Sequence, residues 1–508
     1  MVFCAVRATV QTAIPREGKV PTHPMSVSTP KPERIPSREE NFSEWYIETV
    51  RKADLADYTV VKGCMVIKPY GFGLWENMRD ALDRRIKETG HENAYFPLLV
   101  PESLLLKEAE HVEGFAPECA WVTHGGGSEL EERLAIRPTS EAIICSIYAN
   151  WVNSYRDLPI LINQWANVMR WEKRTRLFLR TAEFLWQEGH TVHRTEEEAQ
   201  EETLKMLEVY REFLETELAI PAVAGEKTAS ERFAGAMRTY TVEALMQDGW
   251  ALQAGTSHNL GQHFSKGFGI KFLDEDNVEK FAWQTSWGVS TRLVGGIIMT
   301  HGDDRGLRLP PRVAPVQAVI VPIYKAGIEG ELKEKCARIA KALREKGVRV
   351  REDMRENQRP GFKFTEWEIK GVPVRIEVGP KDLKNGTACL VRRDTGEKAF
   401  LPDDEAVERV AELMVEIQSN MLETARAFRE EKTSRPSNWE EFQSLLEEKR
   451  GFLSCPWDGT EETEEAIKAA TKATIRCIPF EGSEVDAGET DIYSGKPAVA
   501  RVLYARAY

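Results

Sequence analysis

Hydrophobic side chains recur at helical spacing in three stretches of the N-terminal half of the chain. They predict a helix that starts near residue 41, a second over residues 73–89, and a long amphipathic helix over residues 195–218. Gly90 ends the second helix. One face of that helix carries a regular hydrophobic stripe formed by Leu74, Met78, Leu82 and Ile86.

The stretches between these helices are typical of sheet strands. Candidate strands lie in "AYFPLLVPES", "ERLAIRPTSE" and "PILINQWANVMRW", with a Gly-rich turn at "HGGGSE". Further strands are predicted around "RTYTVEALMQDGWALQAGTSHNLG" and "EKFAWQTSWGVS", followed by a helix from Thr291. Consecutive strands with helices on one side predict an antiparallel sheet of the α+β class.

The pattern changes near a cluster of prolines at Pro310, Pro311 and Pro315. Beyond it, apolar strands alternate with a Lys-rich helix, which predicts a small α/β domain. A charged helix then starts near residue 405 and leads to a small α+β C-terminal piece. The sequence therefore predicts four parts: a disordered tail or linker over 1–40 and domains over 41–310, 315–402 and 403–508.

Composition narrows the class of protein. The chain has 508 residues, 42% hydrophobic and 29% charged, and this is enough for several domains with real cores. It lacks an apolar run long enough to span a membrane, and we expect a cytoplasmic protein. The net charge of −13 argues against a general polyanion binder, so any contact with nucleic acid must be local. The eight cysteines form no CxxC pair, and the sequence signals neither a disulfide framework nor a zinc site.

The stretch "VMRWEKRTRLFLRTAEFLWQEGH", residues 168–190, carries charge where a sheet core is normally apolar. Arg170 and Glu172 are two apart, so on a strand they would face the same side of the sheet. One later row shares a face and consists of Phe184, Trp186, Glu188 and His190. A solvated, salt-bridged face is the alternative, but such faces seldom carry a Phe, a Trp and a His together. The row therefore predicts a site for a small charged ligand.

Three segments resemble the signatures of class II aminoacyl-tRNA synthetases. "MRWE" followed by "RTAEF" is similar to the second signature, and "GHENAYFP" is similar to the first, which builds a dimer interface. "SWGVSTRLVGG", with Arg292, resembles the third. "RPTSE", "FLWQEGH", "AGTSHNLG", "GDDRGLRLPPRVAP" and the terminal Tyr together resemble the prolyl-tRNA synthetases of the eukaryotic and archaeal type, over about residues 42–508.

This resemblance implies a reaction and its partners. ATP would activate L-proline to prolyl-adenylate, and the prolyl group would pass to the 3′ end of tRNA(Pro). The enzyme would work as a homodimer, with Mg²⁺ on the phosphates through ligands that the sequence does not identify. The resemblance assigns catalytic roles to Arg170, Glu172 and Arg292. It assigns ATP contacts to Arg170, Arg180, Thr181, Phe184, Gln253, Thr256, Ser290 and Arg292.

The same resemblance assigns the proline pocket. Thr139 and Glu141 would receive the imino group, and aromatic side chains would enclose the ring. The full set of expected proline contacts is Phe115, Thr139, Glu141, Arg170, Trp186, Glu188, His190, Phe233 and His258. For Phe115 and Phe233, ordinary core packing is the alternative interpretation.

Two features depart from the family pattern. The segment between Phe184 and Trp283 is too short for the large editing insertion of bacterial-type members, so we do not expect editing within this chain. Many relatives also carry a C-terminal zinc site of four cysteines, whereas only Cys455 and Cys477 lie in the matching region here. Two thiolates cannot close a tetrahedral structural site, and we predict no zinc.

The block over residues 315–401 resembles an anticodon-binding domain. Its stretch "RENQRPGFKFTEWEIKG" combines cations with Phe362, Phe364 and Trp367, which fits either base stacking or a domain core. Two other functions stay open. A catalytically inactive synthetase-like protein that binds tRNA or a partner is disfavoured by the intact catalytic set. A sibling synthetase for threonine, glycine, serine or histidine is disfavoured by the loop over residues 139–141.

Overall fold

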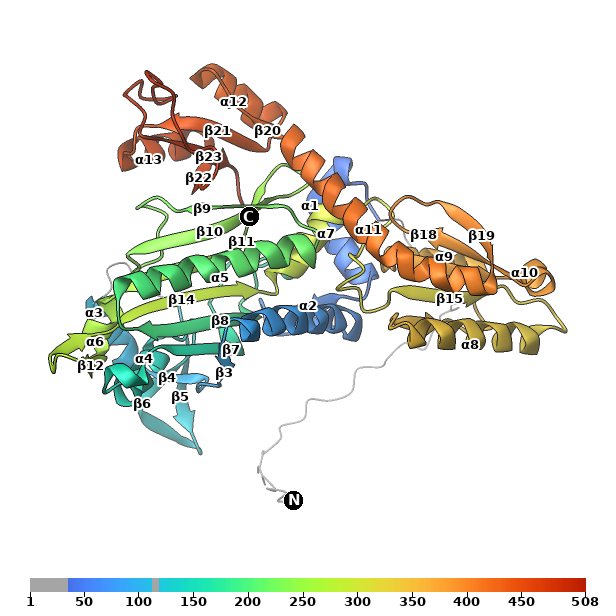
Figure 1. Ribbon diagram of the computed structural model, residues 1–508, viewed down its shortest axis with the longest axis horizontal. Helices are drawn as coiled ribbons and strands as arrows, with labels where there is room; N and C mark the ends of the chain where they lie inside the picture. Colours follow the sequence, from blue (N-terminus) through green and yellow to red (C-terminus); the bar gives the residue numbers. More distant parts are fainter. Residues whose placement is uncertain (1–34, 112–117) are drawn as a thin grey trace, which may run out of the picture. The chain divides into compact units, whose positions relative to one another are not determined.

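The computed structural model describes residues 35–111 and 118–508 (Figure 1). Phe115, one of the expected proline contacts, lies outside the described residues. Helix α1 (Arg38–Lys52) begins inside the stretch predicted as a disordered tail, with Ser37 and Glu40 forming its capping box. Residues 35–40 therefore belong to the folded part, because Ile35 is also buried in the core. The remainder of the predicted tail lies outside the described residues.

Among the described residues, eleven strands form one continuous sheet. Seven of them come from residues 92–290, and all neighbours in this part pair antiparallel except β3 and β7. From the β3 edge they are β3 (Glu92–Asn93), β7 (Ile160–Met169), β8 (Glu183–His193), β14 (Trp283–Ser290), β11 (Ala251–Gly261), β10 (Arg238–Leu245) and β9 (Ala222–Glu226). The predicted antiparallel sheet is present.

Long helices cover one face of this sheet. Helix α5 (Glu196–Thr216) lies across β10, β11 and β14 (Figure 1), and Thr195 and Glu198 form its capping box. The predicted helix over residues 195–218 is thus confirmed almost to its ends. Helix α2 (Pro69–Glu88) begins four residues before the predicted start, because Pro69 suits the first helical turn. Helix α7 (Arg292–His301) follows β14 directly.

Smaller elements complete this part of the molecule. The Gly-rich turn joins β5 to β6 through Gly126 and Gly127, whose φ angles of 61° and 90° favour glycine. The remaining strands and helices are β1 (Ala56–Tyr58), β2 (Met65–Ile67), β4 (Leu99–Pro101), α3 (Glu102–His111), β5 (Ala120–Gly125), β6 (Ser128–Ile136), α4 (Glu141–Trp151), the 3₁₀ turn η1 (Tyr155–Asp157), α6 (His263–Phe268), β12 (Lys271–Leu273) and β13 (Glu279–Phe281).

The middle block is a five-stranded sheet in the order β16-β15-β17-β18-β19. Strands β15, β16 and β17 run parallel and β18 and β19 antiparallel, which agrees with the predicted alternation of strands and helices. Its elements are β15 (Ala318–Pro322), α8 (Glu329–Glu345), β16 (Val350–Glu352), α9 (Pro360–Ile369), β17 (Val374–Val378), α10 (Pro380–Asn385), β18 (Thr387–Arg392) and β19 (Lys398–Pro402). The charged helix is α11 (Asp403–Glu431), 29 residues long.

Helix α9 decides between two interpretations of its aromatic residues. Trp367 is buried and its Nε1 donates a hydrogen bond to Asp353, at 2.9 Å, so it belongs to the core. Phe364 is partly buried and lies under the guanidinium of Arg375. Only Phe362, of the three, is classed as exposed. The interpretation in which all three aromatic rings are free to stack on bases is therefore wrong.

The C-terminal block extends the main sheet instead of forming a separate one. Strand β22 (Thr474–Pro479) pairs with β9, Ile478 opposite Glu226 and Pro479 opposite Gly225. A Cβ on Gly225 would lie 2.4 Å from the carbonyl oxygen of Ile478, so the close approach requires glycine. The other elements of the block are β20 (Thr433–Ser434), α12 (Trp439–Glu448), β21 (Phe452–Trp457), α13 (Glu461–Thr471) and β23 (Ala500–Ala505).

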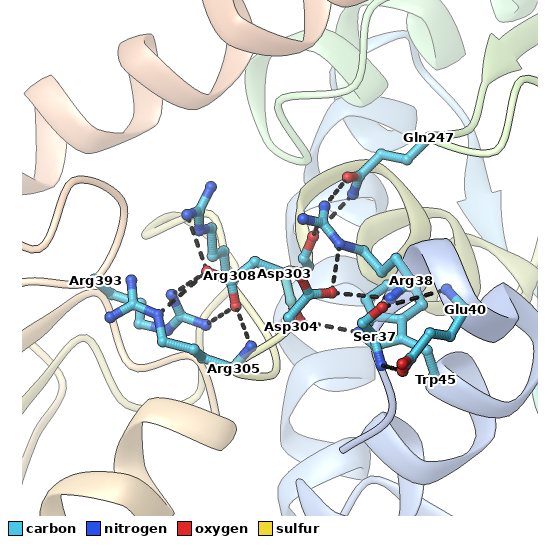
Figure 2. Close-up of polar contacts among 11 residues, drawn as sticks. Ser37, Arg38, Glu40, Trp45, Gln247, Asp303, Asp304, Arg305, Arg308 and Arg393 are labelled. Carbon is cyan, nitrogen blue, oxygen red and sulfur yellow. Dashed lines mark hydrogen bonds and ion pairs between the residues drawn. The ribbon is translucent and has the colours of Figure 1, made fainter. Parts of the chain in front are cut away.

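Two consecutive aspartates after α7 link three parts of the chain (Figure 2). The carboxylate of Asp303 accepts two hydrogen bonds from Arg393 of the middle block, at 2.6 and 2.9 Å, and pairs with Arg308 at 2.9 Å. Its carbonyl oxygen accepts from the indole of Trp45 in α1, at 2.9 Å. Asp304 accepts from the backbone and side chain of Arg38.

We expect Asp303→Asn to lower the free energy of unfolding at neutral pH by about 3 kcal/mol, because buried Arg393 loses its counter-charge. Although burial opposes ionisation, Arg393 and Arg308 lower the pKa of Asp303 from 3.8 to about 2. Its stabilisation is therefore complete above the unfolded value and is lost as the pH falls toward 2. Urea unfolding followed by tryptophan fluorescence should show the two proteins converging over that window.

Asp304→Asn is the matched control, since the Asp304 side chain is 47% exposed and pairs with Arg38 at the surface. Asp304→Asn should lower the free energy of unfolding by less than about 1 kcal/mol. An equal loss of unfolding free energy in both variants at every pH would contradict the role given to Asp303.

Candidate active site

A cavity of about 310 Å³ opens over strands β8, β11 and β14. Most of the residues predicted for ATP and proline meet there. They are Thr139, Glu141, Arg170, Phe184, Trp186, Glu188, His190, Phe233, Gln253, Thr256, His258, Ser290 and Arg292.

Strand β8 supplies the row of side chains that the alternating pattern predicted. Phe184, Trp186, Glu188 and His190 all line the cavity, as residues two apart on a strand must share a face. The rings of Phe184 and Trp186 meet edge to face, with centroids 6.1 Å apart. The interpretation of this row as a ligand-binding face is supported by its position in the cavity.

Arg170 and Glu172 occupy a different position from the predicted one. Strand β7 ends at Met169, so both residues lie in the loop beyond it and do not share a strand face. The backbone N–H of Arg170 donates to the carbonyl of Ala182, at 2.7 Å, and its Nε donates to the carbonyl of Pro138, at 3.0 Å. These bonds hold the loop against the start of β8, and Arg170 lines the cavity.

Arg170 lies between aromatic rings and carboxylates. Its guanidinium carbon is 5.5 Å from the ring centre of Phe184 and 5.7 Å from that of Trp186. Burial lowers the pKa of Arg170, and the nearby charges of Glu141 and Glu188 oppose that shift. An arginine remains cationic under these conditions, so the cavity keeps a positive charge suited to an anionic oxygen.

Glu188 and His190 form a buried pair at the floor of the cavity. Their Oε2 and Nε2 atoms are 2.9 Å apart, and Glu188 Oε1 accepts from Ser140 at 2.5 Å and Gln164 at 2.8 Å. Burial lowers the pKa of His190, but the hydrogen bond and charge of Glu188 outweigh it and raise the pKa above 6.5. The carboxylate thus favours the protonated imidazole.

Glu141 lies at the beginning of helix α4, where the helix dipole favours a carboxylate. Its side chain is buried and accepts a hydrogen bond from the Thr139 hydroxyl. The preceding loop is fixed by fully buried Arg137, which donates to the carbonyls of Phe96, at 2.7 Å, and Asn167, at 2.8 Å. A buried carboxylate with a free oxygen face suits a cationic amine.

Phe233 and His258 form the opposite wall of the cavity. Their rings are stacked with centroids 4.6 Å apart, and the Thr239 hydroxyl lies 3.0 Å from His258 Nδ1. Burial and the neighbouring His190 lower the pKa of His258 to about 3, so this imidazole is neutral. Phe233 lines the cavity and also packs against the neighbouring hydrophobic core.

Three predicted residues lie beside the cavity instead of in its lining. Arg180 Nε donates to Glu172 Oε2, at 2.7 Å, and both line an adjoining groove that also contains Arg170. Thr181 is buried and donates to the carbonyl of Glu183, at 2.7 Å, so its hydroxyl is already engaged. Arg292, by contrast, lines the cavity, and its Nε donates to the carbonyl of Leu179, at 3.3 Å.

Several lining residues were not predicted. Lys227 and Glu231 come from the loop directly after β9, and Thr239 from the start of β10. Gly255 and Gly288 also line the cavity, and a Cβ on Gly255 would lie 3.2 Å from Tyr210 and Val242 of the core behind the sheet. Glycines inside strands are a recognisable sign of a close ligand approach, so "ALQAGTS" and "TSWGVS" could have indicated this floor.

Family models match the three parts of the chain. Residues 121–301 match the tRNA synthetase class II core domain (G, H, P, S and T), residues 317–413 an anticodon binding domain, and residues 439–508 the C-terminal part of prolyl-tRNA synthetase. A proline–tRNA ligase of Rubrobacter xylanophilus is 60% identical over 94% of this chain and 99% of its own. A proline–tRNA ligase of Natranaerobius thermophilus is 56% identical over 93% of this chain and 98% of its own.

The chain belongs to the prolyl-tRNA synthetase family. A crystal structure of the prolyl-tRNA synthetase from Cryptosporidium parvum, complexed with halofuginone and AMPPNP, matches with a TM-score of 0.90. It is 40% identical and covers 94% of this chain and 99% of that one. The predicted fold class, a class II catalytic fold with anticodon-binding and C-terminal domains, is confirmed. The match to proline-specific relatives over nearly the full length argues against a sibling synthetase.

Replacing Glu141 by Gln should weaken the binding of L-proline by about 100-fold, because a cationic amine in this buried site loses its counter-charge. Binding of ATP alone should stay unchanged. Titration calorimetry with L-proline and with ATP measures the two affinities. Glu279→Gln is the control, as its carboxylate is 63% exposed and pairs with Lys271 far from the cavity. Unchanged proline affinity in the Glu141 variant would refute this role.

Proposed function

We propose that the cavity binds L-proline beside ATP and forms prolyl-adenylate. By family membership the chain is an aminoacyl-tRNA ligase for proline, and the roles of its residues are the proposal. The observation that supports it is the convergence of Arg170, Glu141, Arg292 and the β8 row on one cavity. Cationic groups would then face the carboxylate and the phosphates, the anionic group would face the imino nitrogen, and aromatic groups would face the proline ring and adenine.

The reaction requires little covalent work from the protein. A carboxylate oxygen of proline attacks the α-phosphorus of ATP, the bond to the bridging oxygen of the β-phosphate breaks, and pyrophosphate leaves with that electron pair. A terminal ribose hydroxyl of tRNA(Pro) then attacks the acyl carbon, loses its proton, and AMP leaves. Rate comes from positioning the anions and stabilising the charge that develops on phosphorus. Arg170 is placed to bind both the carboxylate and the α-phosphate through its guanidinium.

The proline side of the cavity would recognise charge and size. Thr139 and Glu141 would receive the imino group, while Glu188 holds His190 at the floor. The ring would lie among Trp186, Phe233 and His258. Large aromatic walls exclude bulkier amino acids by steric clash, whereas a smaller ring-less amino acid is rejected only by about 1 to 3 kcal/mol per lost methylene.

The nucleotide side would hold adenine between Phe184 and Arg292, with polar contacts from Gln253, Thr256 and Ser290. Arg180 and Glu172 would act from the adjoining groove, and Thr181 would contribute through the loop that it fixes. Within the described residues no group of three or more His, Cys, Asp or Glu side chains could hold a metal ion. Mg²⁺ would therefore be bound mainly by the phosphates, where it supplies charge neutralisation.

The thiols of the C-terminal block do not fit a zinc site. Burial raises the pKa of the Cys477 thiol to about 12 and that of Cys455 further still, so both remain protonated. Zinc binds the thiolate form. We keep the prediction that this block folds without zinc.

The wider organisation is proposed from the same residues. Residues 41–310 would form the catalytic domain, 315–402 would bind the anticodon, and 403–508 would form the C-terminal domain. Tyr95, 70% exposed beside the β3 edge of the sheet, suits a homodimer interface built by the first signature. None of the described helices combines the length and apolar character that crossing a membrane requires. We propose a cytoplasmic enzyme.

Proline-dependent exchange of pyrophosphate into ATP tests this function. Among the twenty amino acids, proline should support exchange, and Arg170→Ala should reduce the rate by about a thousandfold, because the α-phosphate loses a preorganised donor. Arg133→Ala, a surface change at a side chain 52% exposed, should leave the rate unchanged. Exchange that depends on another amino acid would overturn the pocket assignment, and no exchange in the wild-type protein would support the inactive alternative.

A further inference from the structure

A buried ion cluster lies against the cavity and joins three segments that are distant in the sequence. Glu243 of β10 is fully buried, and its Oε1 accepts from Lys227 Nζ at 3.1 Å and from the Thr241 hydroxyl at 2.9 Å. Arg476 donates to both oxygens of the same carboxylate, at 3.0 and 3.2 Å. Of the two cations, Lys227 lines the cavity.

The cluster carries more positive than negative charge. One carboxylate, Glu243, faces two cations, and both cationic side chains are more than nine-tenths buried. Among the described residues, Glu243 is the acceptor recorded for Lys227 Nζ, which leaves donors of the ammonium for another partner. An uncompensated buried cation is costly in the free protein. An anionic ligand in the cavity would remove that cost.

Strand pairing places this cluster beside the proposed nucleotide contacts, because Thr241 and Glu243 of β10 lie opposite Thr256 and Gln253 of β11. Burial lowers the pKa of Arg292, and among the charges acting on it Glu243 raises that pKa while Arg476 lowers it. Burial would raise the pKa of Glu243, but Lys227 and Arg476 hold it below its ordinary value. The carboxylate is therefore ionised at neutral pH, and its charge is already balanced by one cation before a ligand arrives.

Arg476 comes from the C-terminal block, which holds this wall of the cavity at two further points. Glu464 of α13 accepts from the Thr228 hydroxyl at 3.0 Å, and Lys468 of α13 pairs with Glu231 at 3.3 Å. Glu231 itself lines the cavity and is balanced by that lysine. Glu231 also acts on Arg476, whose pKa its charge raises, and it shares that charge with Lys468 at the surface.

We propose that Lys227 is a catalytic residue whose ammonium contacts anionic oxygens at the reacting α-phosphate, and that Arg476 is a positioning residue acting through Glu243. This inference rests on the proposed function of the cavity. Arg476 neutralises Glu243, so that Lys227 is free to turn toward the phosphate. Without Arg476, Lys227 and Glu243 would form a neutral one-to-one pair, and the cation would be withdrawn from the reaction.

The first test is Lys227→Met in proline-dependent pyrophosphate exchange. The wild-type rate, measured alongside, tests the proposed function separately. We expect kcat to fall about 100-fold with the KM for proline within about threefold of wild type, because the lost donor acts on the transition state. Lys227→Arg should recover part of the loss. A wild-type kcat in Lys227→Met would overturn the catalytic assignment.

The second test uses charge balance to separate positioning from simple support of the fold. Arg476→Met reduces the cluster to zero net charge and should lower kcat about tenfold. The double variant Glu243→Gln with Arg476→Met restores the single positive charge and should bring kcat back to within about threefold of wild type. Circular dichroism confirms that each variant is folded.

Arg501→Met is the matched control. Arg501 is another buried arginine of the C-terminal block, and it bonds within that block to Glu489 and the carbonyl of Ser454. The Arg501→Met variant should leave kcat unchanged. A double variant no more active than Arg476→Met, or an equal loss in Arg501→Met, would show that Arg476 only supports the fold.

Discussion

A buried charge must be paired, and this requirement organises the cavity and the blocks around it. Inside the cavity, Glu188 holds His190 and Ser140, and Glu141 holds Thr139. Each of these carboxylates already has partners before substrate binds, so the groups are fixed in position. Preorganised dipoles and charges need no rearrangement during the reaction, which is where a synthetase of this class gains most of its rate.

The same requirement connects the cavity to other parts of the chain. Helix α7 has Arg292 at its first residue, inside the cavity, and Asp303 two residues after its end. Asp303 is held by Arg393 of the middle block, so a helix of ten residues separates the proposed nucleotide site from the proposed anticodon block. On the other wall, Arg476 links the C-terminal block to Glu243. Ion pairs with distant segments therefore hold both the far end of α7 and Glu243 beside the cavity.

Local patterns predicted the parts of the site that one element provides. The row from Phe184 to His190 followed from the two-residue period of a single strand. Arg170 and Glu172 were placed wrongly on a strand, because β7 ends at Met169 and periodicity does not mark that end. Trp367 is a core residue because Asp353 accepts its indole N–H, a tertiary contact that its basic neighbours do not indicate. Lys227 was missed since its partners, Glu243 and Arg476, are brought together only by the pairing of β9 with β10 and β22.

This pairing has a consequence for how the site is completed. Strand β22 follows β9 by about half of the chain, and the whole middle block lies between them. Contacts so distant in sequence carry a large loop-closure cost and form late in folding. The core of β7, β8, β11 and β14 can form the proposed proline pocket from closer segments, but the wall that contains Lys227 depends on the last strands of the protein. The C-terminal block has a structural role here, because Arg476 places a buried charge on Glu243 beside the cavity.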